Sequence, residues 1–162
     1  MIKKFPVLLT IPVIFFLDRI SKMIIIHRYR EGESSAVISK VFYLTRVNNT
    51  GAAFGILKGS AFLLMIVSLV CVLGLSVLIA KDFFEKKKMN SKDRLFSEKM
   101  RHYALILVIG GAAGNLYDRF FYGYVVDFLD FLVWPVFNIA DIFISIGIFL
   151  ILVSFFKTGK AF

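Results

Sequence analysis

Residues 61–80 read AFLLMIVSLVCVLGLSVLIA and contain no charged side chain. About 20 apolar residues is the length at which an α-helix crosses the hydrocarbon core of a bilayer. Three further apolar segments lie at about 5–26, 103–121 and 135–156. Because unpaired backbone groups are costly in lipid, segments of this length must be helical. The sequence therefore predicts a mainly α-helical integral membrane protein with four transmembrane helices.

The composition supports this class. Of the 162 residues, 59% are apolar and 16% aromatic, with a mean hydropathy of +0.80. Soluble domains contain about 45–50% apolar residues, so an ordinary soluble or disordered chain is excluded. Cys71 is the single cysteine, which rules out an intramolecular disulfide and a cysteine-based metal cluster. The length predicts one domain over residues 1–162.

The distribution of Lys and Arg predicts the orientation in the membrane. Basic residues flank both ends of the chain and fill a loop at about 81–101, and an even number of spans places all three regions on one side. Since cytoplasmic segments carry the excess of Lys and Arg, both termini and this loop are predicted to be cytoplasmic, beside anionic membrane lipids. The formal net charge of +9 is thus a topology signal. No nucleic-acid partner is expected, because no basic face interleaved with aromatic residues accompanies the charge.

Two segments are predicted to lie on the outer side. The first follows residue 27, is rich in Val, Ile, Phe, Tyr and Thr over 36–49, and has glycines at 51, 55 and 59. This pattern indicates two or three short strands, a small extracytoplasmic β-segment at about 36–58 between the first and second helices. The second segment, at about 120–131, is short and aromatic.

Polar residues interrupt three of the four predicted spans in their outer halves. Ionisable groups inside spans are costly and usually face a protein interior or a water-filled cavity. Because these residues share one depth, three helices can contribute to a single polar site. The residues are Asp18, Arg19 and Lys22 in the first span, Asn115, Asp118 and Arg119 in the third, and Asn138 and Asp141 in the fourth, with Asp127 in the preceding connection.

Most of these residues have two interpretations. Asp18 and Lys22 are four apart on one helix face, where they either form a structural ion pair or contact a substrate. Asp118 and Arg119 either mark the membrane boundary, with Arg119 held by a neighbouring carboxylate, or belong to the site. The glycines at 110, 111 and 114 are most simply a close-packing face between helices.

Asp127 and Asp141 are harder to explain as structural residues. Asp141 lies several residues into the fourth predicted span, past Pro135, with no Lys or Arg in that span to neutralise it. If Asp127 folds back beside it, repulsion between the two carboxylates would keep one protonated and one ionised. That arrangement can activate water against an amide. A catalytic dyad is therefore one hypothesis from the residues alone.

Five ordered blocks resemble the lipoprotein signal peptidases, or signal peptidase II, a family of bacterial membrane aspartyl proteases. The blocks are DRISK (18–22), NTGAAF (49–54), GGAAGNLYDR (110–119), VVDF (125–128) and FNIAD (137–141). The resemblance implies that Asp127 and Asp141 are catalytic. It also implies substrate-binding or supporting roles for Asp18, Lys22, Asn49, Gly51, Asn115, Asp118, Arg119 and Asn138, with Asp118 supporting Arg119.

Two positions depart from the family's usual pattern. Arg19 stands where Gln is common, and residues 142–143 are Ile-Phe where small or polar residues are common. Because neither position is assigned to chemistry, the departures are expected to affect packing only.

The resemblance also implies a reaction. The substrate is a bacterial prolipoprotein, and the enzyme cuts on the amino side of a cysteine that carries diacylglycerol. One Asp takes a proton from water while the other, protonated, polarises the peptide carbonyl, and no metal or organic cofactor is needed. The protein is expected to be a monomer in the bacterial cytoplasmic membrane with its active site near the outer face.

Three other classes remain as alternatives. Tyr117-Asp118 is compatible with a presenilin-type aspartyl protease, although the Gly-x-Gly-Asp motif of that group is absent. A magnesium-dependent lipid transferase uses clustered Asp ligands, but no span carries several Asp at helical spacing. A transporter or assembly factor would use buried charges as an ion path, but no inverted repeat accompanies them.

Overall fold

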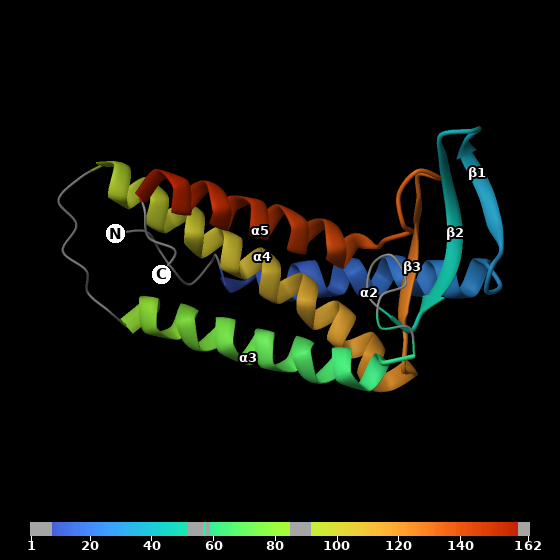
Figure 1. Ribbon diagram of the computed structural model, residues 1–162, viewed down its shortest axis with the longest axis horizontal. Helices are drawn as coiled ribbons and strands as arrows, with labels where there is room; N and C mark the ends of the chain where they lie inside the picture. The colour runs from blue at the N-terminus through green and yellow to red at the C-terminus, as the bar shows by residue number, and fades with distance from the viewer. Residues whose placement is uncertain (1–7, 52–56, 58, 85–91, 159–162) are drawn as a thin grey trace.

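The computed structural model describes residues 8–51, 57, 59–84 and 92–158. Four long helices run along the long axis of the molecule, and a small sheet crosses one end of them (Figure 1). In chain order the elements are α2 (Thr10–Arg28), β1 (Ser34–Ile38), β2 (Phe42–Asn49), α3 (Ala61–Phe84), α4 (Lys92–Tyr122), β3 (Val125–Asp130) and α5 (Ile139–Thr158). The fold is mainly helical, as the sequence predicts.

Three of the described helices are long and apolar enough to cross a membrane: Ala61–Lys81, Lys99–Tyr122 and Ile139–Phe156. The remaining long helix, α2, is not in this set, because Asp18, Arg19 and Lys22 interrupt its apolar sequence. The prediction of a helix at about 5–26 is confirmed from Thr10 onward, and α2 extends to Arg28. Residues 5–7 lie outside the described residues.

The predicted connection at 81–101 separates two candidate spans, which end at Lys81 and begin again at Lys99, but it is partly helical. Helix α3 continues to Phe84 and α4 begins at Lys92, whereas residues 85–91 lie outside the described residues. The physical reason is that Lys, Arg, Glu, Leu and Met are good helix formers, so a helix does not stop where its apolar sequence stops.

The start of the last helix also differs from the prediction. Helix α5 begins at Ile139 rather than near 135, because Phe137 pairs as an extended residue with Leu129 of β3. Phe137 donates its backbone N–H to the carbonyl of Leu129 at 3.1 Å and accepts from the Leu129 N–H at 2.8 Å. Asp141 therefore lies in the first helical turn and not deep in the span.

The sheet has three antiparallel strands in the order β1-β2-β3. The strands predicted within 36–58 correspond to β1 and β2, and residues 52–56 and 58 lie outside the described residues. The third strand, β3, comes from the outer segment at about 120–131, for which the sequence predicts no strand. It pairs Val125 with Asn49 and Asp127 with Val47, which brings two distant motif blocks together.

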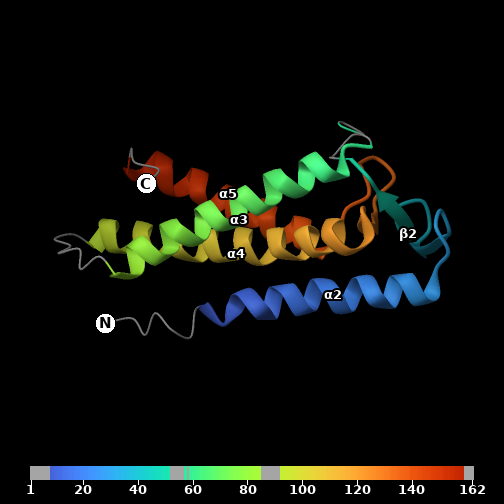
Figure 2. The same ribbon diagram turned by 90° about the horizontal axis from the view of Figure 1, so that it is seen from below.

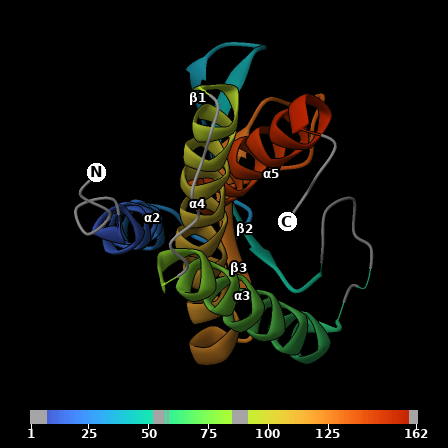
Figure 3. The same ribbon diagram turned by 90° about the vertical axis from the view of Figure 1, so that its left-hand side faces the viewer.

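Helix α4 lies at the centre of the helices and contacts α2, α3 and α5 (Figure 3). Its glycines allow close approach: a Cβ on Gly110 would lie 2.9 Å from the Cβ of Ile14, and one on Gly111 would lie 2.5 Å from the backbone oxygen of Ala140. The prediction of a close-packing glycine face is confirmed. Figure 2 shows α2 running alongside α4.

The sheet is attached to the end of α2. Ile25 of α2 packs in one buried cluster with Val126 and Phe128 of β3. Arg46 of β2 donates to the carbonyl of Tyr29 at 2.9 Å, just beyond the helix end. These contacts hold the sheet over the ends of α2 and α4 and over the starts of α3 and α5 (Figure 1).

Candidate active site

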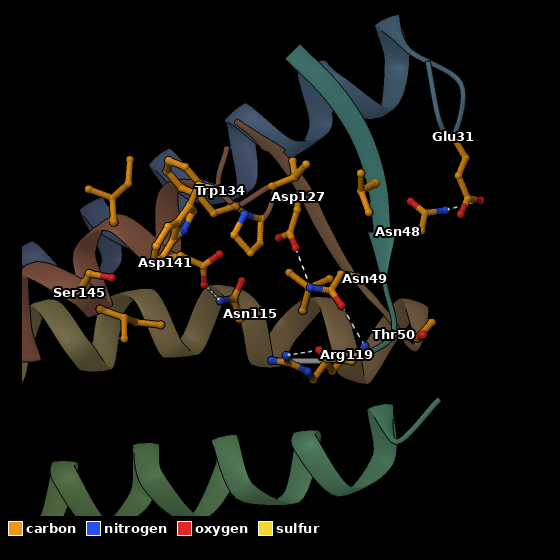
Figure 4. A pocket seen from close by; sticks show the side chains of 18 of the residues that line it. Glu31, Asn48, Asn49, Thr50, Asn115, Arg119, Asp127, Trp134, Asp141 and Ser145 are labelled. Carbon is orange, nitrogen blue, oxygen red and sulfur yellow. Dashed lines mark hydrogen bonds between the residues drawn. The ribbon is translucent and has the colours of Figure 1, made fainter. Parts of the chain in front are cut away.

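A cavity of about 960 Å³ lies where the sheet meets the helices. Both Asp127 of β3 and Asp141 of α5 line it, together with Arg119 of α4 (Figure 4). The other lining residues are Glu31, Val47, Asn48, Asn49, Thr50, Gly51, Asn115, Val125, Trp134, Pro135, Val136, Phe137, Ile142, Ile144, Ser145 and Ile146. Two carboxylates from separate elements therefore face one space.

Hydrogen bonds at the start of α5 fix the position of the Asp141 side chain. Asn138 is the residue before α5, and its Oδ1 accepts the backbone N–H of Asp141 at 3.0 Å. Asp141 Oδ2 in turn accepts the backbone N–H of Asn138 at 3.2 Å. This reciprocal pair is a capping box, in which the N-cap side chain and the third helical residue satisfy each other's backbone donors. The cap fixes the side chain of Asp141 at the helix start.

Two amide side chains hold Asp127. Asn49 of β2 donates Nδ2 to its Oδ2 at 2.8 Å, and Asn138 donates Nδ2 to its Oδ1 at 2.6 Å. The side chain is almost fully buried, with 3% of its surface exposed. Burial, followed by the negative charge of Asp141, raises the pKa of Asp127 to about 7, although both amide hydrogen bonds act in the opposite direction.

Asp141 is more open than Asp127 and has a separate amide partner. Asn115 of α4 donates Nδ2 to Asp141 Oδ1 at 2.8 Å (Figure 4). The Oδ1 of Asn115 accepts from Lys22 Nζ at 2.9 Å and from Asn138 Nδ2 at 3.2 Å. Each of the two carboxylates is therefore oriented by amide donors that other elements supply.

Four charged side chains form a buried cluster behind the cavity wall. Lys22 Nζ lies 2.8 Å from Asp18 Oδ2 and 2.9 Å from Asp118 Oδ2. Arg19 forms an ion pair with the other oxygen of Asp118, and its guanidinium lies over the ring of Tyr117. The interpretation of Asp18 and Lys22 as an ion pair is confirmed. Both side chains are fully buried and absent from the cavity lining.

The structure corrects the expected role of Asp118. Its partners are Arg19, Lys22 and the backbone N–H of Val126, the last at 3.2 Å, and not Arg119. Arg19 was expected to affect packing only, yet it neutralises this carboxylate. Sequence alone missed the pair because 99 residues separate its partners.

Arg119 is the cationic side chain of the cavity wall. Its Nη2 lies 3.5 Å from the carbonyl oxygen of Gly51, at the outer limit of a hydrogen bond. Within the described part of the chain, no carboxylate lies within ion-pair distance of it. Arg119 therefore presents a positive charge to the cavity.

The predicted site residues fall into two groups. Six line the cavity: Asn49, Gly51, Asn115, Arg119, Asp127 and Asp141. Four lie behind it: Asp18, Lys22, Asp118 and Asn138. In the parts that the structure describes, no three His, Cys, Asp or Glu side chains are grouped to hold a metal ion.

Sequence analysis missed several lining residues, among them Glu31, Trp134 and Ser145. Ser145 had a usable signal, because it follows Asp141 by four positions and so shares its helix face. Trp134 and Glu31 lie in connections whose path is set by tertiary contacts, and no local pattern marks them.

Comparison with solved structures defines the class. The chain is similar to two structures that are described as bacterial membrane enzymes, with TM-scores of 0.78 and 0.75 and 30% sequence identity to each. The matches cover 96% and 94% of this chain and 90% and 94% of those chains. The fold is that of a bacterial membrane enzyme.

Sequence comparison defines the family. The family model described as "Signal peptidase (SPase) II" matches residues 10–157. A lipoprotein signal peptidase of Halothermothrix orenii is 36% identical over 95% of this chain and 97% of the relative. One of Nostoc punctiforme is 46% identical over 89% of this chain and 85% of the relative. The chain belongs to the signal peptidase II family of lipoprotein-processing membrane proteases, which confirms the resemblance seen in the motifs.

Proposed function

We propose that this protein is an intramembrane aspartyl endopeptidase that removes the signal peptide from diacylglyceryl-modified prolipoproteins. The cut falls on the amino side of the lipidated cysteine, and Asp127 and Asp141 form the catalytic dyad. The observation that carries the proposal is that these two carboxylates, from different elements, line one cavity while separate amides orient each of them.

The proposed reaction divides the work between the two carboxyl groups. Asp141, the more open group, is the base that takes a proton from water as the hydroxide attacks the peptide carbonyl carbon. Asp127 carries the proton, because burial and the charge of Asp141 raise its pKa, and it gives that proton to the carbonyl oxygen. When the C–N bond breaks, the proton on Asp141 passes to the leaving amine and Asp127 regains its own. The pair shares one proton throughout, so its titration belongs to the pair.

The cavity lining supports a lipid-modified peptide as substrate. Asn49, Asn115 and Arg119 offer hydrogen-bond donors to a peptide backbone, and Gly51 also lines the cavity. Trp134, Ile142, Ile144 and Ile146 contribute apolar lining, as an acyl chain or an apolar signal segment requires. The substrate assignment rests on family membership together with this combination.

We also propose that α2 is the fourth span. Its 19 residues correspond to a rise of about 28 Å, near the 30 Å of a hydrocarbon core. The charged residues within its length, at positions 18, 19 and 22, are buried against α4 and α5, whereas Val13, Phe16 and Ile20 are each more than half exposed. Arg28, at the end of the helix, is exposed. A helix with polar residues inside and apolar residues outside suits lipid.

The proposed topology follows from four spans. The site lies at the end where α2 and α4 finish and α3 and α5 start, which is opposite to the basic region near Lys81. The positive-inside rule then assigns both termini to the cytoplasm and the site to the outer face of the bacterial cytoplasmic membrane. Residues 1–162 act as one monomeric domain.

The experiment is a cleavage assay with purified protein in detergent or proteoliposomes. A prolipoprotein with diacylglycerol on its cysteine is compared with the same precursor lacking the lipid, and mass spectrometry identifies the new N-terminus. The proposal predicts a product that begins with the lipidated cysteine, from the modified precursor only. A cut elsewhere, or equal cleavage of both precursors, would refute the substrate assignment.

Chelation separates this mechanism from a magnesium-dependent one. Since two carboxyl groups supply the proton transfers, we expect full activity after exhaustive treatment with a chelator. Loss of activity that added Mg²⁺ restores would favour the metal-dependent alternative.

A further inference from the structure

Lys22 is an unusual side chain for a membrane helix, because it is fully buried and its ammonium group has three oxygen partners. Nζ lies 2.8 Å from Asp18 Oδ2, 2.9 Å from Asp118 Oδ2 and 2.9 Å from Asn115 Oδ1. The contact with Asn115 is a hydrogen bond, whereas the contacts with Asp18 and Asp118 are ion pairs without hydrogen-bond geometry. Because Arg19 also forms an ion pair with Asp118, this cluster of four side chains contains two positive and two negative charges.

The two carboxylates around Lys22 each hold the backbone just before one member of the proposed dyad. Asp18 Oδ1 accepts the N–H of Ala140 at 3.0 Å, and the next residue is Asp141. Asp118 Oδ2 accepts the N–H of Val126 at 3.2 Å, and the next residue is Asp127. The Lys22 ammonium therefore connects the two carboxylates that fix the main chain just before Asp141 and just before Asp127.

Lys22 also determines which way the amide of Asn115 points. Lys22 Nζ can only donate, so the Asn115 atom that faces it must be the oxygen. The NH₂ group of Asn115 is then directed at Asp141 Oδ1, at 2.8 Å. Without the ammonium, the Asn115 oxygen keeps the longer hydrogen bond from Asn138 Nδ2, at 3.2 Å, and loses the shorter one.

We propose that Lys22 is a positioning residue, which sets the relative placement of Asp127 and Asp141 through Asp18, Asp118 and Asn115. The proposal rests on the dyad function above and deepens it. Lys22 does not touch the substrate, because its side chain is fully buried and does not line the cavity. Its effect reaches the reaction only through the groups it binds.

The expected consequence of losing Lys22 is a slower chemical step. Misplacing reacting groups by about 1 Å costs about 100-fold in rate. We therefore expect Lys22→Met to lower kcat by about that factor while KM changes little, because the cavity wall is intact.

The dependence of kcat on pH distinguishes a positioning role from a purely structural one, because a loss of stability alone would not shift it. The charged groups acting on Asp127 are Asp141 of α5, Lys22 of α2 and Arg119 of α4. The positive charge of Lys22 lowers the pKa of Asp127. Removing that charge should move the alkaline limb of the kcat profile to higher pH.

Arg19→Gln is the matched control. Arg19 follows Asp18 on the same helix and pairs with Asp118, but it contacts neither Asn115 nor the cavity. We expect Arg19→Gln to lower the thermal stability, to lower kcat less than Lys22→Met does, and to leave the pH profile unchanged. If both variants lose activity equally, with no shift for Lys22→Met, Lys22 is merely structural and the proposal is overturned.

Two further variants keep the test decisive if Lys22→Met does not fold. Asp18→Asn/Lys22→Met removes both charges of the ion pair and leaves an oxygen for the Ala140 N–H. Asn115→Ala should reproduce the fall in kcat, and adding Lys22→Met to it should cost less than in the wild-type background. Unchanged kcat in Asn115→Ala, or full additivity, would overturn the proposal.

Asp127→Asn and Asp141→Asn are assayed in the same series. If both retain activity, the dyad function itself fails. If both are inactive while the Lys22 variants behave as wild type, only the positioning role fails.

Discussion

Asn49 shows how one residue links two motif blocks. Its side chain donates to Asp127 at 2.8 Å and accepts the N–H of Gly51 at 2.9 Å, so it fixes both the carboxylate and the turn after β2. The next residue back, Asn48, has the same side chain but donates to Glu31 at the rim of the cavity. The two neighbours therefore provide a matched comparison.

We expect Asn49→Ala to reduce kcat by about 100-fold, because misplacing a reacting group by about 1 Å costs about that factor. Because its hydrogen bond lowers the pKa of Asp127, the alkaline limb of the profile should also move to higher pH. Asn48→Ala should retain kcat. Steady-state assays across pH measure both effects, and equal losses for the two variants would contradict this role.

The raised pKa of Asp127 makes stability depend on pH. In the unfolded chain an Asp has a pKa near about 4, whereas in the folded protein burial and the charge of Asp141 raise it to about 7. Between these values the folded state holds a proton that the unfolded state releases, so stability falls as the pH rises through this window.

In the Asp127→Asn variant, the side chain at position 127 cannot ionise. The variant therefore does not lose stability as the pH rises through this window. The gain in melting temperature over wild type should be larger at about pH 8 than at about pH 5. Thermal unfolding in detergent at both values provides the measurement. An equal gain at the two pH values would show that Asp127 does not bind a proton more tightly in the folded state.

At the scale of elements, apolar length predicted each helix but not all of its ends. The strand β3 was missed, although Val125-Val126-Asp127-Phe128 is β-prone, because a strand is identified only when its partner is known. The start of α5 was misplaced for the same reason: its position depends on the pairing of Phe137 with Leu129. Both errors fall where residues far apart in sequence meet.

The contact between α4 and α5 makes a further prediction. A Cβ on Gly111 would lie 2.5 Å from the backbone oxygen of Ala140, which cannot move aside easily. Gly111→Ala should therefore destabilise the protein by about 1–3 kcal/mol through overpacking. It should also lower activity, because Ala140 precedes Asp141.

Gly74→Ala in α3 is the control for that substitution. A Cβ there meets nothing within 4 Å. It should be neutral, or stabilising by up to about 1 kcal/mol, since Ala is the better helix former. Thermal unfolding of the two variants distinguishes a steric clash at position 111 from the effect of replacing any helical glycine by alanine. Equal melting temperatures would contradict the packing account.

At the scale of the whole molecule, the sequence indicated that polar residues of three helices share one depth, but it did not reveal their partners. The pairing of Asp118 with Arg19, and the position of Lys22 between two carboxylates, depend on how the helices rotate about their axes. Rotation is set by the packing of α4 against α2 and α5, through contacts such as that of Gly110 with Ile14. Such contacts are not encoded in any local pattern.

Thiol labelling tests the proposed topology of the whole molecule. In a Cys71→Ser background, Val133→Cys lies at the sheet end, where Val133 is 93% exposed. Lys81→Cys lies on an exposed position near the opposite end of α3. A membrane-impermeant reagent applied to intact spheroplasts should label the first and not the second, which should react only after permeabilisation. The reverse pattern would contradict the orientation.

The central claim is that Asp127 and Asp141 together cleave the lipid-modified precursor. The most direct measurement is single-turnover cleavage by wild type, Asp127→Asn and Asp141→Asn under identical conditions. An asparagine has one accepting oxygen, so each variant keeps one of the two hydrogen bonds that its carboxylate accepts, and thermal unfolding identifies the variants that fold. We predict that each folded variant loses cleavage entirely; near-normal cleavage by either one would contradict the account.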